Sequence, residues 1–278
     1  MVATEQNRQQ FEATVAQPND EIDLAAAALL IARDEYPSLD MAAYLRRLDE
    51  MAGEVRDLIG AERHPLTVAA GVARYLFTDL GFVGADEEYF DPRTSFLNDV
   101  MDRRRGIPIS LSVLYMEVAR RAGFEVVGIG LPGHFIVKQL HPMGDVLVDP
   151  FNGGAILSPD GCARKVKEIY GGNLEFQPHM LGAVTKKQIL SRTIHNLKTI
   201  YSAGRDYQRA LSMVELLVVL APWDLDEIRD RGMLRYRLGD LAGALADLEC
   251  YLTYCPEAAD VELVRGNARV IRRMHRRC

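Results

Sequence analysis

The sequence predicts an α+β domain, in which helices pack on a small antiparallel sheet, followed by an all-helical tail. Three observations predict this. Apolar residues change from a helical to a strand-like period after Gly123. Two segments near the C-terminus repeat at a fixed spacing, and the 278 residues exceed the usual size of one core. We expect a flexible arm over residues 1–19, the α+β domain over 20–180 and the helical region over 186–275.

The composition is that of a globular protein and excludes several functions. Hydrophobic residues make up 48% of the chain and charged residues 26%. The net charge of −6 gives no general attraction to nucleic acid. The polar start lacks the pattern of a signal peptide, and the longest apolar run, residues 24–32, is too short to cross a membrane. We therefore expect a cytoplasmic protein that binds neither nucleic acid nor membrane.

The first half of the chain reads as successive helices. Alanine and leucine over residues 20–34 predict the first helix, and a stripe of apolar residues over 41–59 predicts the second, with Ser38 as a possible cap. A third helix is expected over residues 66–80, and a fourth over 108–122 that begins with a proline and ends at a glycine.

The segments after this fourth helix are rich in β-branched residues. They predict strands at 125–130, 134–140 and 146–149, paired as an antiparallel sheet against the helix. This places His134 in one strand and Asp149 at the end of the next strand. Asp149 has a second interpretation, because a carboxylate in the turn "DPFNGG" caps nearby backbone N–H groups.

The helical tail contains a repeat of 34 residues. Aspartate, alanine, leucine and proline recur at this spacing, as Asp206, Ala210, Leu211 and Pro222 and again as Asp240, Ala244, Leu245 and Pro256. This is the period of the tetratricopeptide repeat, in which a small alanine lies where two helices cross. Helices of this kind often bind peptides, so a protein or peptide is the expected partner.

The order of the polar residues suggests a catalytic arrangement. A nucleophile at the start of a helix is activated by the helix dipole, a histidine removes its proton, and a carboxylate orients the histidine. The helix start, His134 and Asp149 occur in that order.

The segments "DRRRGIPISLSVLYMEVARR", "GLPGHFIVK" and "DPFNGG" resemble the transglutaminase-like superfamily. More closely, they resemble the bacterial transglutaminase-core proteins with a tetratricopeptide-like tail, a family named for an invasion-regulator gene neighbour. The resemblance covers roughly residues 20–270. It implies a papain-like fold in which Gly106 precedes the nucleophile and His134 and Asp149 complete the site.

The cysteine that the resemblance implies is absent. Counting back from the end of the helix, its place falls on or beside Pro108, which has no nucleophilic group. Ser110 and Ser112 are the nearest replacements, although Ser110 suits a helix-cap role better. Cys162 would need a permuted arrangement. Asn98 and Arg105 are expected to line the cleft, together with Pro108 and Ser112.

Three functions therefore remain open. The first is a non-catalytic or weakly catalytic protein-binding or regulatory module. The second is a hydrolase or acyl-transfer enzyme that uses Ser110 or Ser112 with His134 and Asp149, and a less favoured third uses Cys162. The four cysteines have no metal-ligand spacing, so neither a metal nor another cofactor is expected.

Overall fold

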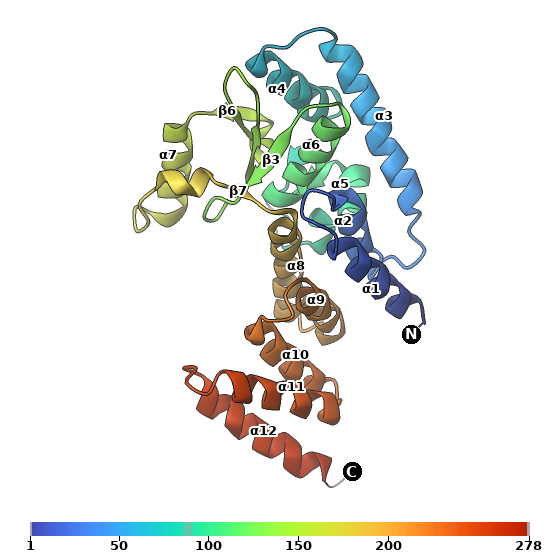
Figure 1. Ribbon diagram of the computed structural model, residues 1–278, viewed down its shortest axis with the longest axis vertical. Helices are drawn as coiled ribbons and strands as arrows, with labels where there is room; N and C mark the ends of the chain where they lie inside the picture. Colours follow the sequence, from blue (N-terminus) through green and yellow to red (C-terminus); the bar gives the residue numbers. More distant parts are fainter. Residues whose placement is uncertain (1, 87, 89, 277–278) are drawn as a thin grey trace. The chain divides into compact units, whose positions relative to one another are not determined.

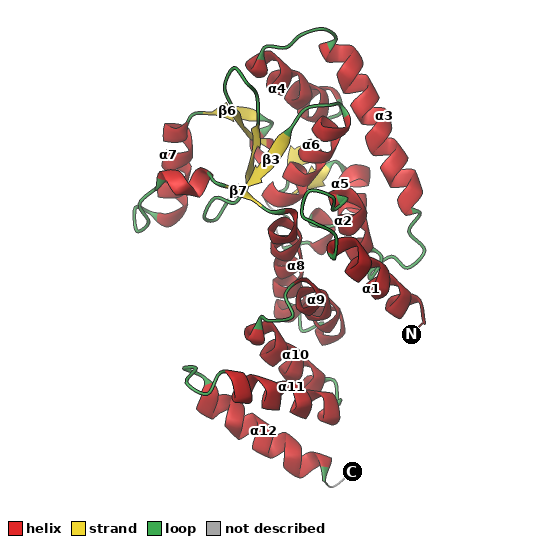
Figure 2. Ribbon diagram, in the orientation of Figure 1, coloured by secondary structure: helices red, strands yellow, loops and turns green. Residues whose placement is uncertain are grey.

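The computed structural model describes residues 2–86, 88 and 90–276 of the chain. The chain divides into two compact units, one ending at Thr193 and one beginning at Ile194. The first unit combines helices with a small sheet and the second is helical (Figure 1, Figure 2). This confirms the predicted α+β domain followed by an all-helical region. The division falls inside helix α8 (Lys186–Ala203), beyond the domain limit expected near residue 180.

The sheet of the first unit is built mostly from neighbouring segments, while its helices are spread along the chain. The α-helices before α8 are α1 (Val2–Val15), α2 (Leu24–Ala32), α3 (Met41–Ile59), α4 (Pro65–Ala73), α5 (Leu97–Arg103), α6 (Pro108–Arg121) and α7 (Pro159–Tyr170). Shorter helical segments are η1 (Arg74–Asp79), η2 (Pro92–Thr94), η3 (Pro150–Asn152) and η4 (Pro178–Leu181). The strands are β1 (Val83–Gly84), β2 (Arg105–Gly106), β3 (Val126–Ile129), β4 (Ile136–Gln139), β5 (Val146–Asp149), β6 (Ala155–Leu157) and β7 (Ala183–Val184).

The N-terminal segment is a helix, not the flexible arm that its polar composition predicted. Helix α1 packs against α2 and buries Phe11 and Val15. Nδ2 of Asn7 donates to the carbonyl of Leu30 and to Oδ1 of Asp34, each at 3.0 Å. Two apolar side chains four residues apart are enough to anchor one face of a helix whose other faces are polar.

Two details of the N-terminal helices differ from the prediction. Asp40, not Ser38, caps α3, because its carboxylate accepts the N–H of Ala43 at 3.1 Å. A negative charge there also suits the positive end of the helix dipole. The helix expected over 66–80 starts one residue earlier, continues as the π-helical segment η1, and ends before Gly81, whose φ is +72°.

Strands β3 to β7 form one antiparallel sheet in the order β6-β5-β4-β3-β7. The three strands expected from the sequence are confirmed, and Val137 of β4 lies opposite Val148 of β5. The short edge strands β6 and β7 were not predicted. Strands β1 and β2 form a separate parallel pair, with Val83 opposite Arg105.

His134 lies in the turn before β4, not within the strand as predicted. Its N–H donates to the carbonyl of Leu131 at 3.1 Å, and β4 begins only at Ile136. Gly133 has a φ of +68°, which residues other than glycine rarely adopt. A Cβ at Gly133 would also lie 2.6 Å from a side-chain carbon of Ile169. The turn therefore requires glycine, and it fixes the position of the histidine.

Helix α6 is the central helix of the first unit. Every residue from Pro108 to Ala119 is buried, and the helix contacts α3, β3, β4 and η3. Its sequence is apolar around most of its circumference, as expected for a helix enclosed by other elements. The helix ends at Arg121, and Gly123 follows with a φ of +95°, which confirms the predicted end.

The second unit continues α8 with α9 (Tyr207–Leu220), α10 (Leu225–Arg237), α11 (Leu241–Tyr254) and α12 (Val261–His275). Helices α9 and α11 begin and end 34 residues apart. They are capped by Asp206 and Asp240, each of which accepts a backbone N–H three residues ahead. Ala210 and Ala244 are fully buried. The predicted repeat is therefore confirmed.

Candidate functional site

The structure brings together His134 and Asp149, the two polar residues that the sequence placed on neighbouring strands. Asp149 is the last residue of β5, one position beyond the Val137–Val148 pair. Nε2 of His134 lies 3.0 Å from Oδ1 of Asp149. Both side chains are buried, and the ring of Phe151 meets the imidazole edge-on at 6.0 Å between centroids. The pair has the orientation of a base and the carboxylate that positions it.

Asp149 has further partners that the sequence did not predict. Nζ of Lys165, on α7, lies 2.9 Å from Oδ2, and Nδ2 of Asn152 donates to the same oxygen at 2.8 Å. The backbone N–H of Asn152 donates to Oδ1 at 3.3 Å, so the carboxylate also caps the turn after β5. We call His134, Asp149 and Lys165 the sheet cluster. Asp149 therefore contacts the histidine and caps the turn at the same time.

The electrostatics of the sheet cluster favour an ionised carboxylate. Burial alone would raise the pKa of Asp149, but His134 and then Lys165 lower it by more, so this pKa lies below its ordinary value. Lys165 also offsets the negative charge that would otherwise act on the imidazole alone. The charge of Asp149 is therefore shared between the imidazole of His134 and the ammonium group of Lys165.

The start of α6 holds no free nucleophile. Pro108 occupies the first helical position. The hydroxyl of Ser110 donates to the carbonyl of Thr94 at 2.6 Å and accepts the N–H of Ile107 at 3.0 Å. A Cβ at Gly106 would lie 2.7 Å from this hydroxyl, so the glycine allows the close approach. Ser110 therefore ties the start of α6 to the preceding loop.

The other proposed cleft residues lie apart from the histidine. Ser112 is fully buried, and its hydroxyl has no hydrogen-bond partner within the described chain. Asn98, on α5, is buried with an unpaired Oδ1. Arg105, on β2, forms an ion pair with Glu88 at 3.6 Å. Within residues 2–86, 88 and 90–276, no hydrogen bond or ion pair joins any of them to His134.

Cys162 does not supply the missing thiol. It is fully buried in α7, within an apolar cluster that includes Val166 and Leu131. Burial raises the pKa of this thiol, and the nearby carboxylate of Asp149 raises it further. A thiol in this environment stays protonated at neutral pH and is a poor nucleophile.

The helical unit has a groove of its own. A cavity of about 590 Å³ is lined by residues of α8, the following turn, the start of α9 and α10: Lys198, Ser202, Ala203, Arg205, Tyr207, Asp230, Met233, Leu234 and Arg237. Arg237 lies over the ring of Tyr207, 4.9 Å from its centroid. Three basic residues and one acidic residue line the groove, so an anionic segment matches it.

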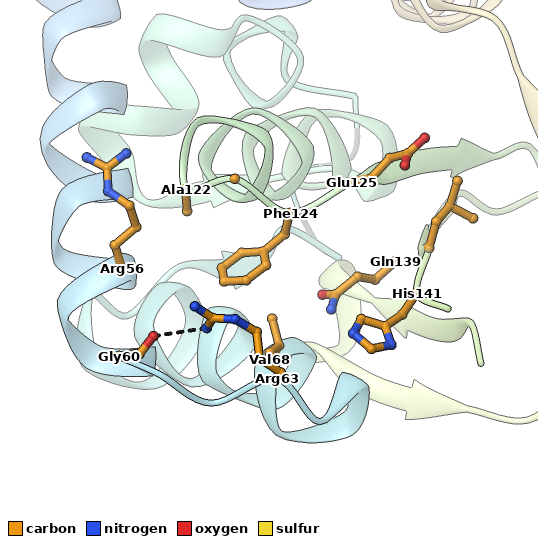
Figure 3. A pocket seen from close by; sticks show the side chains of 11 residues that line it. Arg56, Gly60, Arg63, Val68, Ala122, Phe124, Glu125, Gln139 and His141 are labelled. Carbon is orange, nitrogen blue, oxygen red and sulfur yellow. Dashed lines mark hydrogen bonds between the residues drawn. The ribbon is translucent and has the colours of Figure 1, made fainter. Parts of the chain in front are cut away.

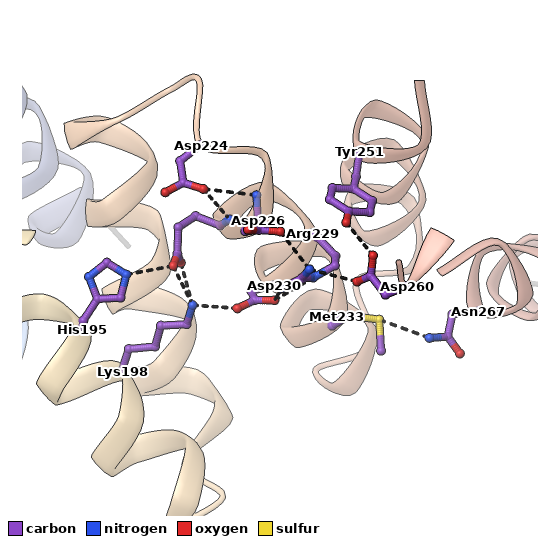
Figure 4. Close-up of polar contacts among 11 residues, drawn as sticks. His195, Lys198, Asp224, Asp226, Arg229, Asp230, Met233, Tyr251, Asp260 and Asn267 are labelled. Carbon is purple, nitrogen blue, oxygen red and sulfur yellow. Dashed lines mark hydrogen bonds and ion pairs between the residues drawn. The ribbon is translucent and has the colours of Figure 1, made fainter. Parts of the chain in front are cut away.

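A polar network joins the helices beside this groove (Figure 4). Nε2 of His195 lies 3.0 Å from Oε1 of Glu227. Nζ of Lys198 lies 2.7 Å from Oε2 of Glu227 and 2.7 Å from Oδ2 of Asp230. We call His195, Glu227 and Lys198 the helix cluster. It links α8 to α10 through one buried carboxylate.

Two of these features had no signal in the sequence. Lys165 lies 16 residues after the aspartate that it neutralises, on a different element, so no local pattern connects them. The bond from Ser110 to Thr94 also spans 16 residues. Asn152, by contrast, had a local signal in the sequence, because its place in "DPFNGG" marked it as part of the turn.

A membrane-spanning helix and a metal-binding cluster are both absent from the described chain. None of its helices is both long and apolar enough to span a bilayer. None of its groups of three or more histidine, cysteine, aspartate or glutamate residues is arranged to hold a metal ion.

Comparison with known proteins places both units. The family model of the transglutaminase-like superfamily matches residues 42–195, and the tetratricopeptide repeat model matches residues 197–269. No solved structure gives a significant match.

Curated relatives match along most of their length. The UPF0162 protein of Xylella fastidiosa (strain Temecula1) is 38% identical over 256 residues, which cover 90% of each chain. The UPF0162 protein of Pseudomonas aeruginosa is 32% identical over 72% of each chain, and the UPF0162 protein YchA of Escherichia coli K12 is 27% identical over 87% of this chain and 89% of its own. The chain therefore belongs to the UPF0162 family, with a transglutaminase-like domain and a tetratricopeptide repeat region.

Proposed function

We propose that the protein is a non-catalytic transglutaminase-like module whose helical region binds an acidic segment of a partner protein. The observation that carries the first part is the state of Ser110. Its hydroxyl is already bonded to Thr94 and Ile107, and Pro108 occupies the preceding turn. A serine can act as a nucleophile only when a base can reach its hydroxyl.

The sheet cluster then serves the fold. Asp149 connects three elements, because it receives hydrogen bonds from the turn before β4, from η3 and from α7. A fully buried carboxylate with several donors stabilises one arrangement of these elements. The second ring nitrogen of His134 has no partner within the described chain, so the imidazole keeps one polar group free for a ligand.

The serine-enzyme alternative would need a change in the start of α6. Ser110 would have to leave Thr94, which would break a buried hydrogen bond and leave that carbonyl unpaired. Ser112 is fully buried, so a substrate could not reach it without movement of α6. No observation favours either change.

The groove of the helical unit supports the choice of an acidic partner. Arg205 lies in the turn between α8 and α9, with a φ of +59°, and no ion pair with it occurs among the described residues. Arg237 stacks on Tyr207, which holds its guanidinium at the wall of the groove. Lys198 is already neutralised by Glu227 and Asp230. The two arginines are therefore the cations available to a partner.

Binding of a labelled peptide to the full chain tests this proposal. A nine-residue peptide rich in aspartate and glutamate should bind, and its asparagine and glutamine counterpart should bind at least about tenfold more weakly. Arg205→Ala and Arg237→Ala should each weaken binding by about three- to tenfold, as measured by fluorescence anisotropy. Arg273→Ala is the matched control, because this exposed arginine of α12 does not line the groove. Equal binding of both peptides would refute the proposal.

A further inference from the structure

A second cavity lies in the α+β unit, where α6 and β4 end (Figure 3). Its volume is about 460 Å³, within the range of small-molecule sites. The lining comes from the end of α3 and the loop after it, from α4, from the turn after α6, and from the end of β4. These segments are far apart in the sequence, so no local motif indicated the cavity.

This cavity is separate from the sheet cluster. His134 precedes β4 and Pro108 begins α6, whereas the cavity is lined by Ala122 after α6 and by Gln139 at the end of β4. A helix of 14 residues is about 21 Å long, and a strand of four residues about 13 Å. The two sites therefore lie at opposite ends of the same two elements.

Gln139 indicates that the cavity accepts a polar ligand. Its side chain is 1% exposed, yet its Oε1 has no hydrogen-bond partner in the described chain. Figure 3 shows the carboxamide extending from β4 into the space between Phe124 and Arg63. A buried carbonyl oxygen without a donor is unfavourable, and most such groups are satisfied in native proteins. A ligand that carries an N–H group would satisfy this one.

The cations of the cavity indicate the charge of the ligand. Nη1 of Arg56 donates to the carbonyl of Arg121 at 2.9 Å, and Nη1 of Arg63 donates to the carbonyl of Gly60 at 3.1 Å. Backbone carbonyls orient both guanidinium groups, and neither forms an ion pair with a carboxylate in the described chain. Glu125, on the rim, is the acidic residue of the lining. Two arginines outweigh it, so an anion is favoured.

His141 and Phe124 complete the cavity. Nδ1 of His141 accepts the N–H of Met143 at 3.1 Å, so a neutral ring carries its proton on Nε2 and can donate from there. The ring of Phe124 lies between Arg56 and Gln139 (Figure 3) and offers an apolar surface. The cavity thus combines an acceptor without a donor, two cations and an aromatic ring.

We propose that this cavity binds an N-acylated amino acid, either free or as the C-terminal residue of a peptide. Its carboxylate pairs with Arg63 through two parallel hydrogen bonds, and Arg56 adds a second positive charge at the wall of the cavity. The amide N–H on the adjacent carbon donates to Oε1 of Gln139. An apolar side chain of the ligand rests against Phe124. This chemistry is separate from the binding of an acidic segment by the helical unit.

Ligand-detected NMR titration of the full chain tests the chemistry with matched probes. N-acetyl-phenylalanine should bind with a Kd on the order of 0.1 to 1 mM. N-acetyl-phenylalaninamide lacks the carboxylate and 3-phenylpropionate lacks the N–H, so each should bind about tenfold more weakly. The pentapeptide Gly-Gly-Gly-Gly-Phe, compared with its amidated form, distinguishes the two sources. If the pentapeptide binds and its amidated form does not, the ligand is the C-terminal residue of a peptide. If the pentapeptide does not bind, the ligand is the free N-acylated amino acid.

Variants locate the bound probe. Gln139→Leu removes the unpaired carbonyl without creating another, so the protein should keep its stability and lose about tenfold in affinity for N-acetyl-phenylalanine. Arg63→Ala should lose a similar factor, and its exposed position makes misfolding no concern. Arg46→Ala, an exposed arginine of α3 outside the lining, should bind as the native chain does. Two results would overturn the proposal. One is that the native chain and Gln139→Leu bind N-acetyl-phenylalanine with equal affinity. The other is that AMP, an anion of a different chemical class, binds more tightly than N-acetyl-phenylalanine.

Discussion

Each unit of the molecule contains a histidine, a carboxylate and a lysine in nearly the same arrangement. In both the sheet cluster and the helix cluster, the Nε2–oxygen distance is 3.0 Å and the lysine lies within 2.9 Å of the second oxygen. In both, burial would raise the pKa of the carboxyl group, but its partners lower it by more. The sheet cluster contains the two residues that the sequence suggested as a site, and the helix cluster joins two helices.

The two clusters differ in burial. The side chain of His134 is 7% exposed and that of His195 is 44% exposed. Besides His134, Asp149 contacts one cation and the side-chain amide of one asparagine. In the helix cluster, by contrast, it is the lysine, Lys198, that has a further partner, the carboxylate of Asp230. A histidine in contact with a carboxylate is therefore not evidence of catalysis by itself. A catalytic role needs a reachable nucleophile, and among the described residues Ser110 is held by Thr94 and Cys162 is buried with a raised pKa.

Removing the carboxylate should have the largest effect, and it should separate the clusters. Asp149→Ala leaves a buried histidine and a half-buried lysine unpaired, which should lower the free energy of unfolding of the first unit by about 3 to 5 kcal/mol. Glu227→Ala should cost the second unit only about 1 to 2 kcal/mol, because Lys198 keeps Asp230. Hydrogen exchange of each unit in increasing urea measures both values. Equal losses would remove the distinction between the clusters.

Removing the histidine should have a smaller effect. His134→Ala leaves Asp149 with Lys165 and Asn152, and the cost should be about 1 to 2 kcal/mol through the lost buried hydrogen bond. His195→Ala should cost less than about 0.5 kcal/mol, because that ring is partly exposed. The same exchange experiment applies. If His195→Ala lost more stability than His134→Ala, burial would not determine which of the two histidine contacts contributes more.

The dependence of stability on pH should give the smallest difference. A carboxyl group whose folded pKa is lowered adds stability above its unfolded pKa, about 3.9 for aspartate, and loses it as the pH falls through the folded pKa. Asp149 therefore stabilises the first unit at neutral pH and stops doing so in acid. Asp149→Asn should be less stable at pH 7 and should lose less on acidification below about pH 4. If the stability of both proteins fell by the same amount on acidification, the assigned direction of the pKa shift of Asp149 would be contradicted.

The elements that local patterns determine were predictable. Strands β3, β4 and β5 followed from β-branched runs, and the boundaries of α6 followed from a proline and a glycine. The 34-residue repeat was visible because two aspartate caps and two buried alanines recur in the sequence. Helix α1 was missed because its contacts with α2, through Phe11 and Val15, are tertiary. The turn before β4 was missed because the periodicity of a strand does not reveal a positive φ at Gly133.

The candidate site was predictable only in part. The His134–Asp149 contact followed from the order of the strands, but Lys165 did not, because α7 had to be placed in space first. The role of Ser110 depended on a carbonyl 16 residues earlier. The cavity around Gln139 combines four separate segments, so the sequence carried no signal for it.

Labelling of the native chain tests the central claim most directly, namely that the sheet cluster has no nucleophile. A fluorophosphonate probe and a chloroacetamide probe are incubated with the native protein and with His134→Ala, and peptides covering residues 106–112 and Cys162 are examined by mass spectrometry. Because Ser110 is bonded to Thr94 and Cys162 is buried with a raised pKa, we expect these peptides to stay unmodified in both proteins. An adduct on Ser110 or Ser112 in the native protein that disappears in His134→Ala would contradict the account and establish a serine enzyme.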